Sequence, residues 1–130
     1  MEDIDDIIYN LLKYSTDLSK ELLSQLDEFY PVCFYYKKGI YKSLAIADWK
    51  GSAKEYGFKL RELLSSNQIN IFTIATDTFI KKDLNERESA IEIYTVYNGV
   101  EYEKSYIFYI RDKKGNYFFS ELTYLHRGTL

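Results

Sequence analysis

The stretch SAIEIYTVYNGVEYEKSYIFYI, residues 89–110, decides the fold of this chain. Its Asn98-Gly99 dipeptide favours a tight two-residue turn, because a type I′ turn needs positive φ at both central residues. The flanking residues alternate as they do in strands, so the stretch predicts an antiparallel hairpin. With regular pairing from the turn, the core face would carry Ile91, Ile93, Thr95, Tyr102, Tyr106, Phe108 and Ile110.

The opposite face of this hairpin is predicted to be acidic and aromatic. It carries Glu92, Tyr94, Glu101 and Glu103. Paired carboxylates can act as general acid and base when burial separates their pKa values. Glutamates on exposed strands more often serve to prevent aggregation along a sheet edge. We therefore expect this face to be a partner surface, and we assign no catalytic residue to it.

Two Lys-Lys-Gly turns mark further hairpins. They are Lys37-Lys38-Gly39 and Lys113-Lys114-Gly115, and each lies between runs of aromatic and β-branched residues. The first hairpin, residues 31–47, is apolar on both faces. This pattern predicts either a central position in the sheet, or a helix on one face and a partner on the other. Self-association as a homodimer is one way to supply that partner.

The apolar residues from Asp3 to about Glu28 recur with helical spacing and predict an N-terminal helical region. Ser15-Thr16-Asp17 interrupts this rhythm and could cap a second helix, so one long helix and two short ones are both open. Pro31 ends the region, because the residue before a proline disfavours helical backbone. Farther along, Ser52 is well placed to cap another helix.

These elements predict a single α+β domain of 130 residues, with the helices packed on one face of a mostly antiparallel sheet. Residues 81–88 are charged and lack an apolar period, which predicts a solvent loop. The predicted layout is a helical region (1–29), a hairpin (31–47), a helix (52–66), strands ending in a meander (69–122) and a tail (123–130).

Charge and composition limit the classes of protein to which this chain can belong. The net charge is −3, yet residues 1–28 alone hold eight acids and two bases. Asp3, Asp5 and Asp6 complement the positive end of the first helix and form a second candidate partner surface. No apolar run reaches the roughly 20 residues of a membrane span, and the acidic N-terminus lacks the features of a secretory signal. Since Cys33 has no intramolecular partner, we expect a cytoplasmic protein.

The residues give no sign of metal or cofactor chemistry. His126 falls in the predicted tail, and together with Cys33 it supplies no zinc-ligand spacing. The six glycines include no phosphate loop, nucleophile elbow or dinucleotide fingerprint. A pI near 5.2 argues against the basic stripe that nucleic acids require, although an aromatic sheet face could stack bases. We predict no cofactor and rank nucleic-acid binding third.

The chain contains fourteen tyrosines, and tyrosine is favoured at recognition surfaces because it offers a large contact area at low entropic cost. The first hypothesis is therefore a non-enzymatic interaction domain that holds a basic partner through the acidic helix or the sheet face around Glu92. The alternative is a small-ligand binder or an enzyme with a pocket between helix and sheet. That pocket would be lined by Trp49, Tyr56, Phe72 and Tyr106.

The segment Leu26-Asp27-Glu28-Phe29-Tyr30-Pro31 and its surroundings resemble a group of small uncharacterised bacterial α+β proteins. Members of that group share a helix, a Glu-Phe-Tyr-Pro segment leading into a hairpin, a second helix and a terminal meander. The resemblance implies a fold and a bacterial source, and it implies no activity. By analogy of class, small acidic proteins of this kind are similar to the immunity proteins that neutralise bacterial toxins.

Overall fold

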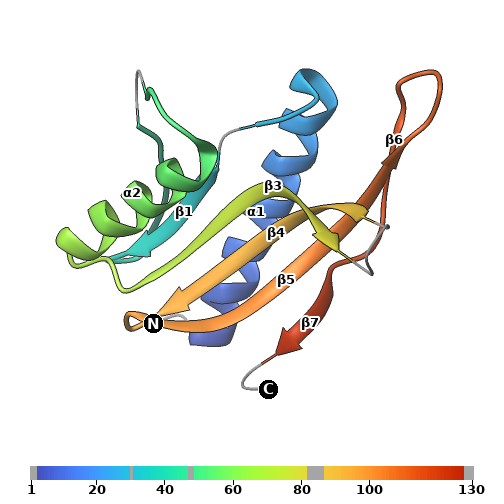
Figure 1. Cartoon of the computed structure of the whole chain (residues 1–130). Coiled ribbons are helices and arrows are strands. Elements are labelled where there is room, and N and C mark those ends of the chain that lie inside the picture. The colour runs from blue at the N-terminus through green and yellow to red at the C-terminus, as the bar shows by residue number, and fades with distance from the viewer. Residues whose placement is uncertain (1–2, 30, 47–48, 82–86, 128–130) are drawn as a thin grey trace.

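The computed structural model describes residues 3–29, 31–46, 49–81 and 87–127, and it confirms the α+β class (Figure 1). A long helix, a hairpin and a second helix precede the strands that complete one curled sheet. The elements are α1 (Ile4–Leu26), β1 (Val32–Lys37), β2 (Ile40–Leu44), α2 (Ala53–Ser66), β3 (Ile71–Lys81), β4 (Arg87–Tyr97), β5 (Val100–Arg111), β6 (Tyr117–Phe119) and β7 (Thr123–Arg127).

The strands form one antiparallel sheet in the order β2-β1-β3-β4-β5-β6, and β7 also pairs with β5. The positions of all three predicted turns are confirmed. Asn98 and Gly99 have φ values of 54° and 77°, as the type I′ turn requires. Lys38-Gly39 joins β1 to β2 with two positive φ angles, and Gly115 has φ 87° in the turn before β6. Local turn chemistry therefore sets where the sheet reverses direction.

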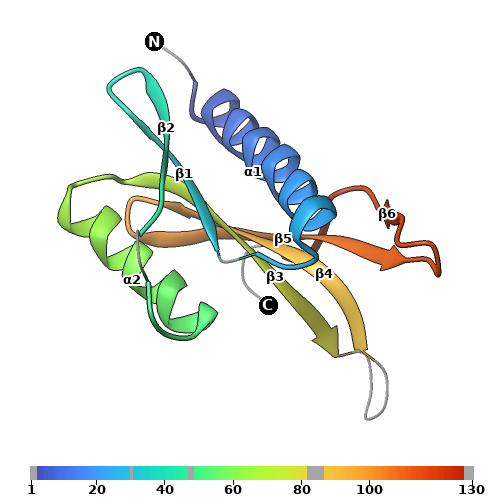
Figure 2. The ribbon, with the colours of Figure 1, turned by 90° about the horizontal axis from the view of Figure 1, so that it is seen from above.

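The two helices cover opposite faces of the sheet, so the prediction that both pack on one face was wrong (Figure 2). The reason lies in β3, whose first five residues are all buried. Ile71 and Ala75 pack in the cluster with α1, whereas Phe72 and Ile74 pack in the cluster with α2. A strand that is covered on both faces has a continuous apolar sequence. Such a sequence does not indicate which helix packs on which face.

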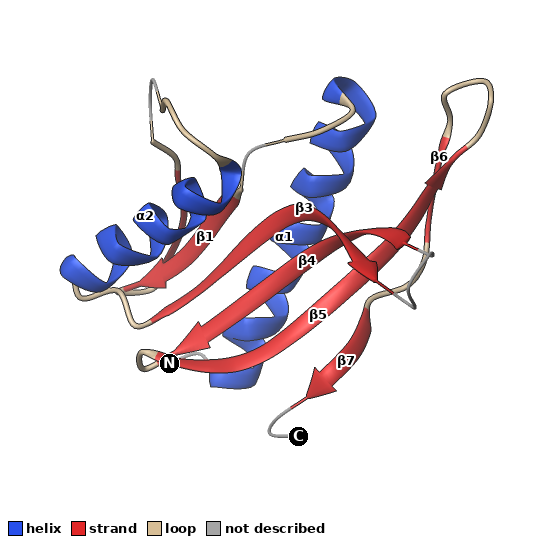
Figure 3. Ribbon diagram, viewed as in Figure 1, coloured by secondary structure: helices blue, strands red, loops and turns tan. Residues whose placement is uncertain are grey.

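The same arrangement explains the first hairpin. Phe34 and Tyr36 of β1 pack against the α1 cluster, and Cys33 belongs to the α2 cluster with Tyr35 beside it. Figure 3 shows α2 in front of the sheet and α1 crossing behind it. Both faces of β1 thus contact a helix layer of the same chain, whereas the edge strand β2 leaves Ile40 53% exposed. The predicted homodimer is not needed to cover β1, and it stays a prediction.

A single helix spans the N-terminal region, which resolves the choice between one helix and two. Ser15 does not cap a second helix. It lies fully buried on the face of α1 that meets the sheet, and its Oγ lies within hydrogen-bond distance, 2.6 Å, of Thr73 Oγ1. Among the described residues no helix combines the length and the apolar character that crossing a membrane would require.

Two serines of α1 allow this interface to be tested. Ser15→Ala leaves the buried Thr73 hydroxyl without its partner, so we expect it to lower the free energy of unfolding by about 1–3 kcal/mol. Ser19→Ala removes a buried hydroxyl that has no hydrogen-bond partner among the described residues, and we expect no loss of stability. Urea unfolding followed by circular dichroism measures both. Ser24→Ala, on the exposed side of α1, corrects for helix propensity, and equal losses at Ser15 and Ser19 would contradict this assignment.

The predicted register of the β4–β5 hairpin was wrong beyond its turn. Tyr97 pairs with Val100 and Val96 with Glu101, as expected, but Thr95 pairs with Glu103 instead of Tyr102. Tyr102 is an extra residue in β5 and forms a β-bulge. Every residue after Tyr102 therefore lies on the face opposite to the predicted one. The core face toward α1 receives Ser105 and Ile107, and the predicted core residues Tyr106, Phe108 and Ile110 lie on the other face.

Two boundaries also need correction. Residues 123–127 of the predicted tail form strand β7, and His126 stands opposite Lys104 of β5 in the backbone register. Of the predicted loop at 81–88, Lys81 belongs to β3, and Arg87 and Glu88 belong to β4. The remaining residues of that loop, 82–86, lie outside the described part of the chain. Strands β3 and β4 are longer than predicted, because their pairing continues through charged residues.

Candidate functional site

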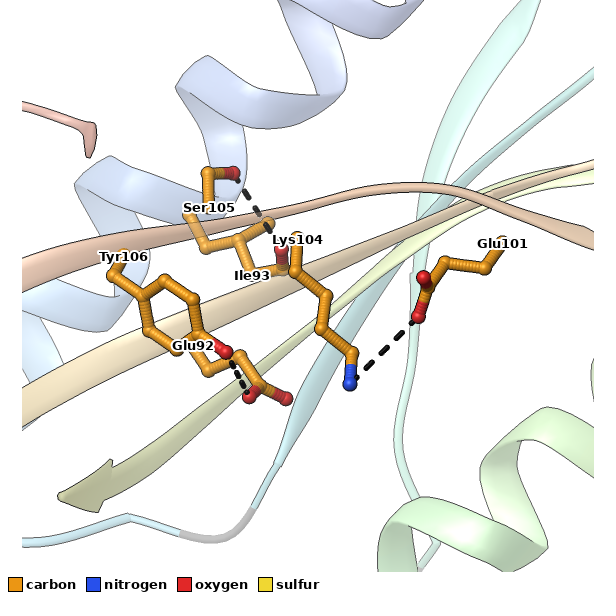
Figure 4. Close-up of polar contacts among 6 residues, drawn as sticks. All are labelled: Glu92, Ile93, Glu101, Lys104, Ser105 and Tyr106. Atoms are coloured by element: carbon orange, nitrogen blue, oxygen red, sulfur yellow. Dashed lines mark hydrogen bonds and ion pairs between the residues drawn. The ribbon is translucent and has the colours of Figure 1, made fainter. Parts of the chain in front are cut away.

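The predicted Glu92 face is only partly acidic, because the bulge removes one of its carboxylates. Glu92, Glu101, Lys104 and Tyr106 project to the α2 side of the sheet, whereas Ser105 points toward α1 (Figure 4). Glu103 pairs with Thr95 and is only 5% exposed. A lysine therefore joins the predicted surface where a glutamate had been expected.

A shallow groove of about 350 Å³ lies between α2 and this face of the sheet. We call it the Tyr94 groove, because Tyr94 of β4 lines it and cations approach the Tyr94 ring from two elements. The side chains that define it are Lys54, Phe58 and Arg61 of α2, Glu92 and Tyr94 of β4, and Lys104 of β5. The periodicity of α2 places the first three on one side, since Lys54, Phe58 and Arg61 follow helical steps of four and three.

The electrostatics of the Tyr94 groove are positive. The Arg61 guanidinium carbon lies 5.1 Å from the centroid of the Tyr94 ring and the Lys104 ammonium nitrogen 5.7 Å from it, both within cation–π range. Lys104 also forms an ion pair with Glu101, at 3.7 Å. Arg61 and Lys54 make no ion pair with any residue that the structure describes. Three cations thus surround a groove whose lining contains one carboxylate, Glu92.

Glu92 and Tyr106 form a hydrogen-bonded pair on the α2 side of the sheet. The Tyr106 hydroxyl donates to Glu92 Oε2 at 3.0 Å. Burial, followed by the Glu92 carboxylate, raises the pKa of Tyr106. The phenol therefore stays protonated and fixes the carboxylate by a hydrogen bond. Tyr106 is therefore a positioning residue for Glu92, which lines the groove.

Phe58 is the exposed anchor of this site. Its side chain is 71% exposed on α2, and two further small cavities lie against it. The apolar stripe of α2 runs through Tyr56, Leu60 and Leu64, and Phe58 falls outside that stripe. Phe58, an aromatic residue on the polar side of an amphipathic helix, was a sequence signal for the α2 side of the site, and the sequence interpretation missed it. Arg61 and Lys104 gave no signal of their own, since only the fold brings them together.

Three of the four predicted pocket residues, Tyr56, Phe72 and Tyr106, are buried, whereas Trp49 lines one of the cavities beside Phe58. Tyr56 and Phe72 are buried in the α2 cluster, and Trp49 contacts Tyr56 edge-on, with ring centroids 5.6 Å apart. The Tyr56 hydroxyl accepts a hydrogen bond from the Ile46 amide. Tyr106 lies on β5 beside Glu92. The rings of Trp49, Tyr56 and Phe72 therefore stabilise the α2 layer.

The acidic residues predicted on α1 lie far from the Tyr94 groove. Asp3 precedes α1 as its N-cap, and Asp5 and Asp6 stand in its first turn, where all three are exposed. Since α1 covers the opposite face of the sheet, these carboxylates and Glu92 belong to separate surfaces (Figure 2).

Asp27, Arg111 and Tyr117 join parts of the fold, and Cys33 lies in its interior. Tyr117 donates to Asp27 at 2.8 Å, and Arg111 reaches the same carboxylate at 3.3 Å, so β5 and β6 are tied to the end of α1. Burial raises the pKa of the Cys33 thiol, which keeps it protonated and unreactive. Within the described ranges no cluster of three or more His, Cys, Asp and Glu residues could hold a metal ion.

In comparisons with known proteins, no family model, no curated protein and no solved structure matches this chain.

Proposed function

We propose that this chain is a non-enzymatic protein-interaction domain that binds an acidic segment of a partner protein in the Tyr94 groove. The observation that carries the proposal is the pair of cations on the Tyr94 ring beside the exposed ring of Phe58. Arginine and aromatic side chains are the residues most enriched at the centres of protein interfaces. The sequence suggested a basic partner, and the charge of the groove favours an acidic one instead.

The shape of the site favours a protein over a small metabolite. Small-molecule pockets enclose most of their ligand among apolar walls. The Tyr94 groove is shallow, and three of the side chains that line it, Lys54, Arg61 and Lys104, are long and charged. Such a surface suits an adaptor, or by analogy an immunity-like protein that covers a partner without turnover.

A peptide-display experiment tests this function. A random 12-residue peptide library is selected on the purified chain, and the enriched peptides are measured by fluorescence anisotropy at low and physiological salt. We expect sequences rich in Asp and Glu. We expect Arg61→Glu combined with Lys104→Glu to weaken their binding by about a hundredfold or more, because charge reversal replaces two attractive contacts by repulsion.

The matched control is Lys42→Glu combined with Lys113→Glu, which changes the net charge equally at exposed positions outside the groove. We expect this control to bind as the unmodified chain does, apart from a small change in association rate. Melting curves of both variants check that they fold. Enrichment of basic peptides, or equal loss in the two variants, would exclude the groove as the binding site.

A further inference from the structure

The α2 side of the sheet is covered over only half of its width. The α2 cluster contains residues of β1, β3 and β4, and none of β5 or β6. Figure 1, viewed from this side, shows α2 over one half of the sheet and the strands β5 and β6 on the other half without a helix in front of them. This open half adjoins the Tyr94 groove, since Tyr94 pairs with Lys104 of β5.

The open half carries an apolar strip at its far end. Ile110 of β5 is 67% exposed and its cross-strand partner Phe118 of β6 is 55% exposed. Both lie on the α2 side, because their neighbours Tyr109 and Phe119 pack against the α1 cluster. Phe108 joins the strip to the groove, as its ring stacks on Tyr106 with centroids 6.3 Å apart. Exposed apolar residues gathered on one uncovered sheet face mark a docking surface.

We propose that the partner segment is an amphipathic helix that lies along the open half of the sheet beside α2. Its acidic residues meet Arg61 and Lys104, and its apolar face covers Phe108, Ile110 and Phe118. This inference rests on the proposed function and specifies the structure of the bound segment. A sheet buries an apolar face beneath a helix, whereas an added extended strand pairs at an edge and leaves the face uncovered.

The dimensions of the surface fix the length of this helix. Lys104 and Ile110 are six residues apart in β5, which corresponds to roughly 20 Å at the rise of an antiparallel strand. A helix of about 13 residues has that length. The 14-residue helix α2 covers the neighbouring half of the same face, so the chain itself provides a helix of the required size in the same layer.

A stacked single-stranded nucleic acid fits the same rings less well. Base stacking needs free aromatic faces. Arg61 and Lys104 already lie over the Tyr94 ring, and Tyr106 is buried and packed against Phe108. An acidic helix can instead pair with Arg61 and share Lys104 with its existing ion-pair partner Glu101. It needs only the apolar edge of the strip.

Two designed libraries test the bound conformation. Both contain 16-residue peptides with acidic residues in the first turn and apolar residues spaced i, i+3, i+4 and i+7. The second library has the same design except that prolines replace the residues at two central positions, which prevents a helix. Peptides are selected on the unmodified chain and then measured on Ile110→Asp with Phe118→Asp, and on Arg61→Glu with Lys104→Glu. Labelled oligouridine is measured on the same three proteins.

We expect enrichment from the helical library alone, and at least about a tenfold loss of affinity in each double variant. We also expect circular dichroism to show that the selected peptides become helical when they bind, which would support the proposed helix. Binding that depends on Arg61 and Lys104 but not on Ile110 and Phe118, or enrichment from the proline library, overturns the helix and leaves the proposed function intact. Failure of both libraries, or tighter binding of oligouridine, overturns the helix and the acidic-segment function together.

Discussion

Deletion of Ser105 from β5 is expected to remove most of the stability of this protein, whereas deletion of Tyr102, three residues earlier, is expected to be tolerated. Tyr102 is the extra residue of the bulge, and it is 40% exposed. Without it Glu101 and Glu103 would become neighbours opposite Val96 and Thr95, which are already their partners. The register beyond that point stays unchanged, so we expect a loss of less than about 1.5 kcal/mol.

Deletion of Ser105 can be accommodated in two ways, and both are costly. If the bulge persists, Tyr106 and every later residue of β5 change faces, and Ile107 leaves the core beneath α1. If the bulge flattens, Lys104 takes the fully buried position of Ser105. Burying an unpaired ammonium or exchanging the core face costs more than about 4 kcal/mol. Urea unfolding measures the difference, and similar losses for the two deletions would contradict a bulge at Tyr102.

The same strand shows what the sequence could predict. Asn98-Gly99 set the turn correctly, because turn geometry is local. The register beyond it was misassigned because both alternations of β5 are plausible as a core face. One set contains Tyr106 and Phe108, and it is more apolar than the set with Ser105 and Ile107. The structure buries Ser105 beneath α1 and leaves the rings on the α2 side.

The sequence could not predict how elements that are far apart in the chain pack against one another. The cap of α2 at Ser52 is confirmed, since its side chain accepts a hydrogen bond from the Glu55 amide. No local signal tells on which face of the sheet α2 packs. The Tyr94 groove depends on that placement, because Arg61, Tyr94 and Lys104 come from three elements. The sequence therefore predicted Glu92, Tyr94 and Glu101 on one face, and it missed the cations that reverse the charge of that surface.

Replacing one buried leucine by alanine in either helix is expected to destabilise the protein strongly, and the two effects are expected to be independent. Leu11 of α1 and Leu60 of α2 are both fully buried, and they belong to the separate clusters on the two faces of the sheet. Replacing a buried leucine by alanine costs about 2–5 kcal/mol, from lost transfer free energy and the cavity left behind. Each of Leu11→Ala and Leu60→Ala should therefore remove a large share of a typical domain stability of about 5–15 kcal/mol.

The double variant distinguishes two helices on opposite faces from two helices on one face. Since the two leucines share no cluster, their effects should add within about 0.5 kcal/mol. Leu11→Ala combined with Ile91→Val, both within the α1 cluster, provides the contrast, and we expect a coupling above that value. Trimethylamine oxide added to all samples keeps the weakest variant folded enough to measure. A coupling of more than about 1 kcal/mol between Leu11 and Leu60 would mean that the helices pack against one another. In that case α2 could not form one wall of the Tyr94 groove.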